Sequence, residues 1–329
     1  MSLGIPLVSV VIVSFNTRNL LRDCLRELEG ETKDIASEVF VVDNNSADGS
    51  ADMVEAEFPE VSLIRSSINL GFAAANNRAF PQCKGKYVVL LNSDAFLRAS
   101  ALQRSIDHME SRPAAGLGGA KLVGRDGSWQ PSARMFPSLL NEFLSMSGLS
   151  AKFAKSRLFG RQDRTWADQG EPAEVDWVPG AFSIIRRDVL EQIGYFDESF
   201  FLYYEEVDLC WRIKKAGYEV WYWPDIEVVH LGGESSKTMN SLSMSKSGAQ
   251  LTLWRMRSEL IYYRKHLGCS AWMVKKLEEL WHGVRAWKNR TDEDTTRAGK
   301  ARDSQTTITL MKQAWSETQG GRLSPQRPW

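Results

Sequence analysis

The chain has 329 residues, 43% of them hydrophobic, enough for one large domain or two smaller ones with a buried core. Lysine plus arginine and aspartate plus glutamate each total 41, so a net charge of zero argues against a nucleic-acid-binding protein, and no nucleic-acid partner is expected. The four scattered cysteines disfavour a zinc site or disulfide framework and indicate a reduced, cytosolic protein. No stretch of the sequence approaches the roughly 20 apolar residues of a membrane-spanning helix.

The first half of the chain alternates short apolar runs with amphipathic segments, which is typical of an α/β domain. Strands are expected at 7–15, 39–42, 61–65 and 88–91, and helices from about 18, at 51–58 and at 71–80. Thr17 is the expected N-cap of the first helix, and Gly30 is its expected end. This alternation predicts right-handed crossovers and a mostly parallel central sheet flanked by helices.

The run from Tyr87 to Leu91 is apolar without alternation, which predicts a central strand buried on both faces. It ends in Asn92, Ser93 and Asp94, at the carboxyl end of the strand, where open α/β sheets bind ligands. Two interpretations of Asp94 stay open at this point. It is either a candidate for chemistry or a cap of the helix expected near Ser100.

The second half of the chain is less regular. Helices are expected at 102–109, before Gly194 and from about 205 to 217, and strands at 116–123, 175–185, 220–223 and 228–230. The glycines of the strand at 116–123 would permit close approach of neighbouring groups. Residues 126–170 show no sustained period and are expected to be irregular, with short helices beside a site.

The composition changes beyond residue 240, which predicts a catalytic domain over 1–240 and a helical extension over 241–329. An amphipathic helix is expected at 251–263, followed by two more helices and a disordered end at 320–329. Two interpretations of the aromatic and basic side chains of this extension stay open: packing on the main domain, or peripheral contact with the inner face of the cell membrane. These side chains are Trp272, Lys275, Lys276, Trp281, Arg285, Trp287 and Lys288.

Asp43 follows the second strand, where a dinucleotide-binding enzyme would hold a ribose, so a nicotinamide dehydrogenase is one alternative. However, the first strand-to-helix turn, residues 14–18, contains no glycine, whereas a pyrophosphate needs a Gly-rich backbone there. A carboxylate after a central strand, such as Asp94, can instead hold a divalent cation that neutralises a diphosphate. The residues therefore favour a nucleotide-sugar site that uses both aspartates.

Seven stretches in order resemble the family 2 inverting glycosyltransferases of the GT-A fold, particularly bacterial rhamnosyltransferase-like members that build polysaccharides. They are VVIVSFN (10–16), VVDNNSADGS (41–50), NLGFAAANN (69–77), LNSD (91–94), WVPGA (177–181), YEEVDLCWR (204–212) and HLGGES (230–235). The resemblance covers roughly residues 7–235 and implies a Rossmann-like α/β catalytic domain. Asn92 replaces the first acid of the usual Asp-x-Asp motif, and Glu205-Glu206 replaces the usual Glu-Asp pair.

The resemblance also implies a role for each matched residue. Donor binding would fall to Ser14, Asn16, Asp43, Asn69, Gly71, Asn76, Asn92, Ser93 and Asp94. Acceptor binding would fall to Trp177, Gly180 and Ala181, and a divalent cation, Mn²⁺ or Mg²⁺, would be held by Asp94 and His230. The catalytic acids would be Glu205, Glu206 and Asp208, with Glu206 as the general base because it aligns with the second acid of the pair.

The expected function is metal-dependent transfer of a sugar, with rhamnose as the candidate, from a nucleotide-diphosphate donor to a glycan or lipid-linked acceptor in cell-surface polysaccharide synthesis. The transfer would invert the anomeric centre. A catalytically silent glycan- or nucleotide-binding protein of the same fold is the alternative, since fold does not fix function. For the three acids, capping of a helix N-terminus is the simpler interpretation, and for His230 it is a structural role.

Overall fold

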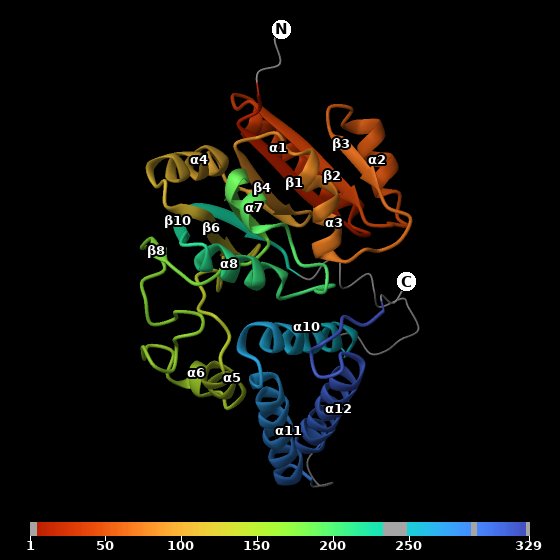
Figure 1. Cartoon of the computed structure of the whole chain (residues 1–329), viewed down its shortest axis with the longest axis vertical. Coiled ribbons are helices and arrows are strands. Elements are labelled where there is room, and N and C mark those ends of the chain that lie inside the picture. Colours follow the sequence, from red (N-terminus) through yellow and green to blue (C-terminus); the bar gives the residue numbers. More distant parts are fainter. Residues whose placement is uncertain (1–4, 233–248, 291–294, 327–329) are drawn as a thin grey trace.

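The computed structural model describes residues 5–232, 249–290 and 295–326. A curled sheet with helices on both faces forms one part of the molecule, and three C-terminal helices form a layer beneath it (Figure 1). The described strands make one ten-stranded sheet in the order β3-β2-β1-β4-β9-β6-β10-β5, with β7 on β6 and β8 on β10. The strands are β1 (Val8–Ser14), β2 (Ser37–Asp43), β3 (Ser62–Arg65), β4 (Tyr87–Asn92), β5 (Ala95–Leu97), β6 (Ala115–Val123), β7 (Trp129–Gln130), β8 (Ala173–Glu174), β9 (Phe182–Arg186) and β10 (Glu219–His230).

The predicted α/β class is confirmed, and β4 is central and buried on both faces as expected. Strands β1 to β4 pair in parallel, but β9 lies antiparallel between β4 and β6, so the second half of the sheet is mixed. An antiparallel neighbour needs no crossover helix, and the irregular segment predicted at 126–170 supplies the connection into β9. The two strands expected at 220–223 and 228–230 are one strand, β10.

Helices cover the two faces of the sheet with separate apolar cores. Buried side chains of α1, α2 and α4 pack on one face, and those of α3, α7, α8 and α10 pack on the other. The helices are α1 (Arg18–Thr32), α2 (Ser50–Glu57), α3 (Phe72–Ala79), the 3₁₀ turn η1 (Phe80–Gln82), α4 (Ala101–Ser111), α5 (Leu139–Met146), α6 (Leu149–Lys152), α7 (Arg187–Ile193), α8 (Glu205–Lys215), α10 (Ala249–Leu267), α11 (Ser270–Lys288) and α12 (Thr295–Glu317).

The expected end of the first helix at Gly30 is wrong, because α1 continues through it to Thr32. An interior glycine costs only about 1 kcal/mol relative to alanine, and the buried leucines of α1 outweigh that cost. Thr17 does occupy the N-cap position, but its side chain makes no capping hydrogen bond. It donates instead to Ser93 Oγ at 2.9 Å, which ties the start of α1 to the end of β4.

The three helices predicted after residue 240 are confirmed as α10, α11 and α12. The disorder expected at 320–329 is wrong for 320–326, while 327–329 lie outside the described residues. Gly320 and Gly321 both have positive φ angles, which lets the chain turn back onto α10. The Gly320 carbonyl accepts from Arg264 Nε at 2.9 Å, and a Cβ on Gly321 would collide with the Leu260 carbonyl.

The C-terminal helices share their core with the sheet. Leu253, Met256, Leu260 and Tyr262 of α10 belong to the same cluster as Val207 of α8 and Val88 and Leu90 of β4. The predicted domain boundary at 240 falls within 233–248, outside the described residues. We therefore propose that 249–326 are an integral layer of the catalytic part. No helix among the described residues has the length and apolar character that crossing a membrane requires.

A buried group of charges lies where α10 meets α5 and α11. The Arg255 guanidinium is 3.3 Å from Glu259 Oε2 and 4.0 Å from Glu278 Oε1, and Glu142 accepts from the Tyr263 hydroxyl at 3.2 Å. The buried carboxyls of Glu142, Glu259 and Glu278 therefore lie near one arginine, whose side chain is 41% exposed. Burial raises the pKa of Glu278 to about 7, with the charge of Glu142 adding to the rise and Arg255 opposing it.

This raised pKa predicts a pH-dependent stability. The neutral form of Glu278 is favoured in the fold, so its stabilising contribution is complete below the unfolded pKa of about 4.5 and is lost as the pH rises through about 7. Glu278→Gln should therefore raise the free energy of unfolding above pH 7 by about 1–3 kcal/mol and change it little at pH 5. Urea unfolding from pH 5 to 8 measures this difference.

Glu279→Gln on the same helix is the matched control. Burial alone would raise the pKa of Glu279, but hydrogen bonds from Lys275 and Lys276 outweigh burial, and the net effect is a lowered pKa. The carboxylate form of Glu279 therefore stabilises the fold, and Glu279→Gln should lose stability above the unfolded pKa. Identical pH profiles for Glu278→Gln and the unchanged protein would contradict the assignment.

Candidate active site

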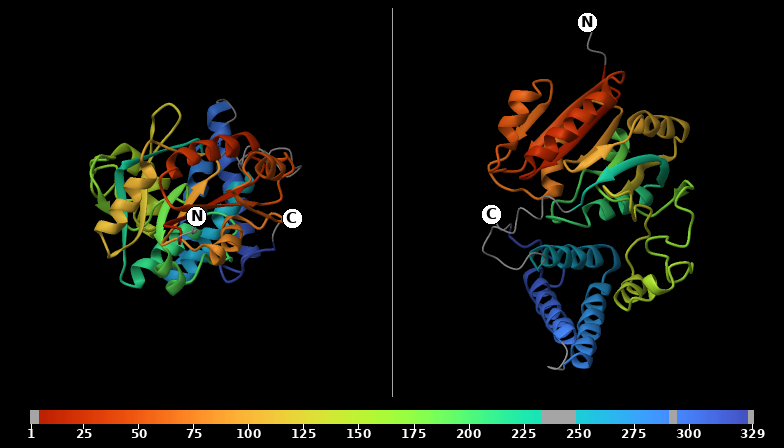
Figure 2. Two further views of the ribbon diagram at one scale, coloured as in Figure 1. Left: turned by 90° about the horizontal axis from the view of Figure 1, so that it is seen from above. Right: turned by 180° about the vertical axis from the view of Figure 1, so that it is seen from behind.

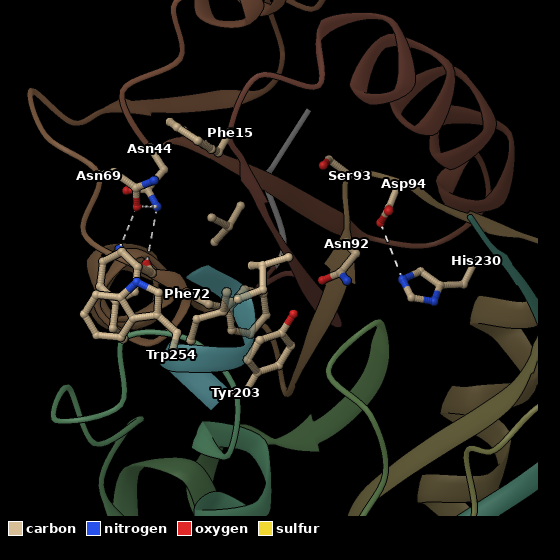
Figure 3. Close-up of a pocket in the computed structure, with 15 residues that line it drawn as sticks. Phe15, Asn44, Asn69, Phe72, Asn92, Ser93, Asp94, Tyr203, His230 and Trp254 are labelled. Carbon is tan, nitrogen blue, oxygen red and sulfur yellow. Dashed lines mark hydrogen bonds and ion pairs between the residues drawn. The ribbon is translucent and has the colours of Figure 1, made fainter. Parts of the chain in front are cut away.

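A cavity of about 260 Å³ lies at the carboxyl ends of β1 and β4, between the start of α3, residues 201–203 and α10 (Figure 3). Six residues predicted from the sequence line it: Asn69, Gly71, Asn92, Ser93, Asp94 and His230. Nine others were not predicted as site residues: Val13, Phe15, Asn44, Phe72, Phe201, Leu202, Tyr203, Leu251 and Trp254. The polar groups gather on the side of the sheet, and the apolar groups come mainly from the loop and α10.

The polar side of the cavity is fixed by two paired amides. Asn44 Nδ2 donates to Asn69 Oδ1 at 2.9 Å, and both side-chain oxygens accept from backbone N–H groups of Leu70 and Gly71. These bonds hold the segment between β3 and α3 against the end of β2. Asn44 belongs to a matched motif, but its role depends on a partner 25 residues away, which the motif does not indicate.

Asp43 is buried at the end of β2, and only one of its oxygens has a partner. Oδ2 accepts from the Ser46 N–H at 3.1 Å, while Oδ1 is buried and has no hydrogen-bond partner among the described residues. A buried acceptor without a partner costs free energy, so this atom is suited to a donor on a ligand.

Four predicted donor residues lie outside the cavity lining, Asp43 and three others, and these three others make bonds within the protein. The Ser14 hydroxyl is 3.0 Å from the Thr17 hydroxyl, which links β1 to α1. Asn16 has a φ of 54°, and its Oδ1 accepts from the Ala47 N–H at 2.7 Å, which joins the loops after β1 and β2. Asn76 Nδ2 donates to the Phe72 carbonyl within α3. We infer that these residues shape the site rather than touch a ligand.

Asp94 and His230 face each other at one end of the cavity, with His230 Nε2 3.6 Å from Asp94 Oδ1 (Figure 3). Asp94 lies in the turn between β4 and β5, and β5 pairs antiparallel with the end of β10 that carries His230. The helix α4 begins later, with Ser100 at its N-cap, so Asp94 is not its cap. The sheet pairing, rather than the sequence spacing, brings these two residues together.

The surroundings of His230 favour a neutral imidazole. Burial lowers its pKa, against the opposing charge of Asp94, and Nδ1 lies 3.0 Å from Gln130 Oε1. If Nδ1 carries the proton and donates it to Gln130 Oε1, the lone pair of Nε2 points toward Asp94. This is the arrangement of a histidine that ligates a metal. Within the described residues no group of three or more His, Cys, Asp or Glu side chains could hold a metal ion. A cation bound by Asp94 and His230 would thus need oxygen atoms of a ligand or of water to fill its remaining coordination positions.

The loop before the acidic helix is held from two sides. Tyr203 and Tyr204 have φ angles of 70° and 69°, a conformation that bulky residues rarely adopt. On one side the Phe201 carbonyl accepts from the Phe72 N–H at 2.8 Å, and a Cβ on Gly71 would collide with it. On the other side Ser258 of α10 donates to the Leu202 carbonyl at 2.8 Å. Such strain is concentrated at functional sites.

Glu205 and Glu206 begin α8 directly after this loop and differ in environment. Burial, followed by the charge of Glu206, raises the pKa of Glu205 well above its usual value. Burial also raises the pKa of Glu206, but backbone amides and the charge of Arg134 oppose the rise. Oε2 of each side chain is buried and has no hydrogen-bond partner among the described residues. Burial therefore favours the protonated form of both acids, while backbone amides and Arg134 favour the carboxylate form of Glu206.

Asp208 is fully buried in an ion-pair network and does not line the cavity. Its carboxylate lies 2.8 Å from Arg212, 2.6 Å from Lys265 and 2.7 Å from His266. Burial alone would raise the pKa of Asp208, but the His266 hydrogen bond and the Arg212 and Lys265 charges lower it to about 2. We assign Asp208 a structural role, because it joins α8 to α10.

Of the three residues expected to bind an acceptor, only Trp177 is seen in contact with Arg134. The Arg134 guanidinium lies 4.6 Å from the centre of the Trp177 ring, and the two residues are joined by a backbone hydrogen bond. Ala181 accepts from the Asn92 N–H at 3.0 Å, and Gly180 lies next to Phe72. Trp177 is buried, and its indole N–H donates to the Met135 carbonyl. Its ring therefore stabilises the chain around residues 134–136 and is not exposed for stacking against a sugar.

The profile of the family described as "Glycosyl transferase family 2" matches residues 9–194, more than half of the chain. This chain belongs to glycosyl transferase family 2. The dehydrogenase alternative is therefore set aside, and the protein is a family 2 glycosyltransferase.

Relatives of this glycosyltransferase include the N-acetylglucosaminyl-diphospho-decaprenol L-rhamnosyltransferase of Mycobacterium tuberculosis, which is 32% identical over 237 residues, 67% of this chain and 75% of the relative. Rhamnosyltransferase WbbL of Escherichia coli is 23% identical over 288 residues, 84% of this chain and 100% of the relative. The mannosyltransferase PcManGT of Pyrobaculum calidifontis, solved with GDP-Man and Mn²⁺, covers 96% of this chain and 76% of its own at 17% identity, with a TM-score of 0.51. The expected GT-A fold is confirmed.

Proposed function

We propose that this glycosyltransferase is metal-dependent and inverting, and that it transfers rhamnose from a nucleotide diphosphate to a lipid-linked or glycan acceptor. The observation that carries the proposal is the Asp94–His230 pair at the end of the cavity that follows the central strand. The Mycobacterium and E. coli relatives are both rhamnosyltransferases, which supports rhamnose as the sugar. The diphospho-decaprenol in the first name supports a lipid-linked acceptor. The enzyme would then act in the cytoplasm, where activated sugars are available.

The polar side of the cavity is suited to the nucleotide. The unpartnered Asp43 Oδ1 would accept from an N–H of the base or a ribose hydroxyl, with Asn44 and Asn69 beside it. Phe15 and Phe72 supply apolar surface for a planar base. Asp94 Oδ1 and His230 Nε2 would supply an oxygen and a nitrogen to a divalent cation, with Asn92 and Ser93 as polar neighbours. When bound there, such a cation neutralises charge on the diphosphate leaving group.

Glu206 is suited to be the general base. Backbone amides and the charge of Arg134 oppose the rise of its pKa, and Arg134 itself lies over the Trp177 ring in the segment assigned to the acceptor. Its carboxylate would take the proton of the acceptor hydroxyl as that oxygen attacks the anomeric carbon from the side opposite the diphosphate. A single displacement of this kind inverts the anomeric configuration.

Thermal unfolding with a panel of nucleotides tests the proposed function directly. A uridine or deoxythymidine diphosphate should raise the melting temperature, and Mn²⁺ should increase the effect, because ligands that bind the folded state stabilise it. Sugar transfer from the matching nucleotide sugar should follow. Stabilisation by glycans alone, without nucleotide binding or transfer, would instead identify the catalytically silent alternative.

Asp43→Asn sharpens this test. The amide retains one acceptor oxygen, which must serve either the Ser46 N–H or the ligand, but not both. Affinity for the nucleoside diphosphate should fall about tenfold or more, as expected for one lost hydrogen bond of about 1.4 kcal/mol. Calorimetry gives the value, and Asp48→Asn on the neighbouring loop surface is the control that should change it little. Unchanged affinity in Asp43→Asn would exclude a direct contact.

A further inference from the structure

The helix α11 buries one face and leaves the opposite face apolar. Ala271, Val274 and Glu278 face the protein. The large apolar side chains that stay exposed are Trp272 (53%), Met273 (43%), Leu280 (68%), Val284 (52%) and Trp287 (64%). Those from Met273 to Trp287 recur at intervals of seven, four and three residues, so they form one stripe about 21 Å long. This stripe of Met273, Leu280, Val284 and Trp287 on the outer side of α11 is called the α11 face below.

The charges around the α11 face are basic. Lys276, Lys288 and Arg290 are exposed beside it, and the Arg290 guanidinium lies 5.5 Å from the centre of the Trp287 ring. The two acids of α11 are turned elsewhere: Glu278 is buried, and Glu279 is bonded to Lys275 and Lys276. A helix surface with large apolar residues, tryptophans and basic residues is typical of helices that lie in a membrane interface.

The neighbouring helix α12 shows that this pattern is specific to α11. The two helices pack against each other in the same layer (Figures 1 and 2), yet α12 exposes polar side chains. Its exposed positions include Gln305, Thr306, Thr309, Lys312 and Gln313. The exposed apolar surface is therefore not a general property of the C-terminal layer.

A second segment extends the same surface. The helix α5 lies beside α11 (Figures 1 and 2), and the Phe143 and Trp281 rings meet edge to face at 6.4 Å. Leu140 and Phe143 of α5 are 42% and 39% exposed. Residues 143–162 after them contain no acid but four basic side chains, and they expose the apolar side chains of Phe153 and Leu158.

We propose that the α11 face, together with the edge formed by α5 and α6, docks on the surface of an anionic lipid bilayer. Apolar side chains would enter the interface, and the basic side chains beside them would meet anionic headgroups. A second copy of the chain fits this surface less well, because pairing two such faces would bring Lys288 and Arg290 of each copy together, and the described part of α11 exposes no acid to neutralise them. The helix α10 contributes Leu251 and Trp254 to the cavity and packs against α11, so docking would bring a lipid-linked acceptor close to the site.

Vesicle flotation of the full-length chain tests the docking surface. The vesicles contain phosphatidylcholine alone or with 30% phosphatidylglycerol, and each is tested at low and at high salt. The chain should float with the anionic vesicles, and high salt should release part of it. The triple variant Leu280→Glu, Val284→Glu, Trp287→Glu should reduce the bound fraction about tenfold or more. The matched control Gln305→Glu, Thr309→Glu, Gln313→Glu introduces the same charges on α12 and should reduce it much less.

The outcomes separate this inference from the proposed function. Nucleotide-induced thermal stabilisation should be the same in both triple variants and the parent chain, which also shows that each variant is folded. Equal loss of flotation in the α11 and α12 variants would reduce the effect to net charge and overturn the docking face. The docking face would also be overturned if the parent chain did not float with anionic vesicles at low salt. It would be overturned as well if the α11 substitutions converted a dimer to a monomer without changing flotation.

Discussion

Glu206→Gln is expected to lower the rate of sugar transfer by about 10²–10⁴-fold, because the amide keeps the shape of the side chain but cannot accept the acceptor's proton. Affinity for the donor should stay near that of the parent enzyme, since Glu206 does not line the donor cavity. Single-turnover kinetics, together with calorimetry of the nucleoside diphosphate, separate the two effects. A fall in rate without a fall in donor affinity is the signature of a lost base.

Three variants identify the base among the neighbouring acids. Glu206→Asp restores the usual family residue but shortens the side chain by one methylene, so part of the activity should remain. Glu205→Gln changes the neighbouring acid, which is not the one assigned as the base, so the rate should change much less than in Glu206→Gln. Asp208→Asn should lower thermal stability by breaking the network with Lys265 and His266. Near-normal transfer by Glu206→Gln with loss in Glu205→Gln would move the role to Glu205.

Asp94→Asn is expected to remove the effect of Mn²⁺ on nucleotide binding, because a neutral amide is a poor ligand for a divalent cation beside the neutral His230. Transfer should fall by about 10²-fold or more, while binding of the nucleoside without phosphates should persist. Calorimetric titration of nucleoside diphosphate with and without Mn²⁺ measures the change.

Asn92→Asp is the matched control for this site. It restores the first acid of the usual Asp-x-Asp motif in the same cavity, so Mn²⁺ dependence should be retained or strengthened. If Asp94→Asn still showed the full Mn²⁺ effect while His230→Ala lost it, the cation would be held without Asp94 and the assignment would be wrong.

The strands and polar ends of the parallel half could be predicted from the sequence, because local patterns determine them. Continuous apolar runs such as Tyr87 to Leu91 mark buried strands, and the polar residues after them fall at the carboxyl edge of the sheet. Asn69, Asp94 and His230 were located in this way and by resemblance. The motifs could not show which matched residues face the cavity: Ser14 and Asn76 lie in the right stretches but bond within the protein.

The rest of the site depends on contacts between distant segments, which no local pattern contains. Leu251 and Trp254 come from α10, and they reach the cavity only because that helix packs across α8. The antiparallel position of β9 depends on the path of an irregular segment, which has no periodicity. Gly320 and Gly321 indicate disorder in a sequence but act here as a turn onto α10.

The hold that α10 has on the acidic loop limits how this enzyme can be recombined with its relatives. Ser258 supports Leu202, while Lys265 and His266 reach Asp208, so the C-terminal layer fits one particular loop and one particular helix α8. A chimera that exchanges the extension alone would place an α10 from one enzyme against the loop and helix α8 of another, so these contacts would be lost. Exchange of residues 195–216 with the extension as a single block would preserve these contacts, so this block is the unit that a chimera should keep together.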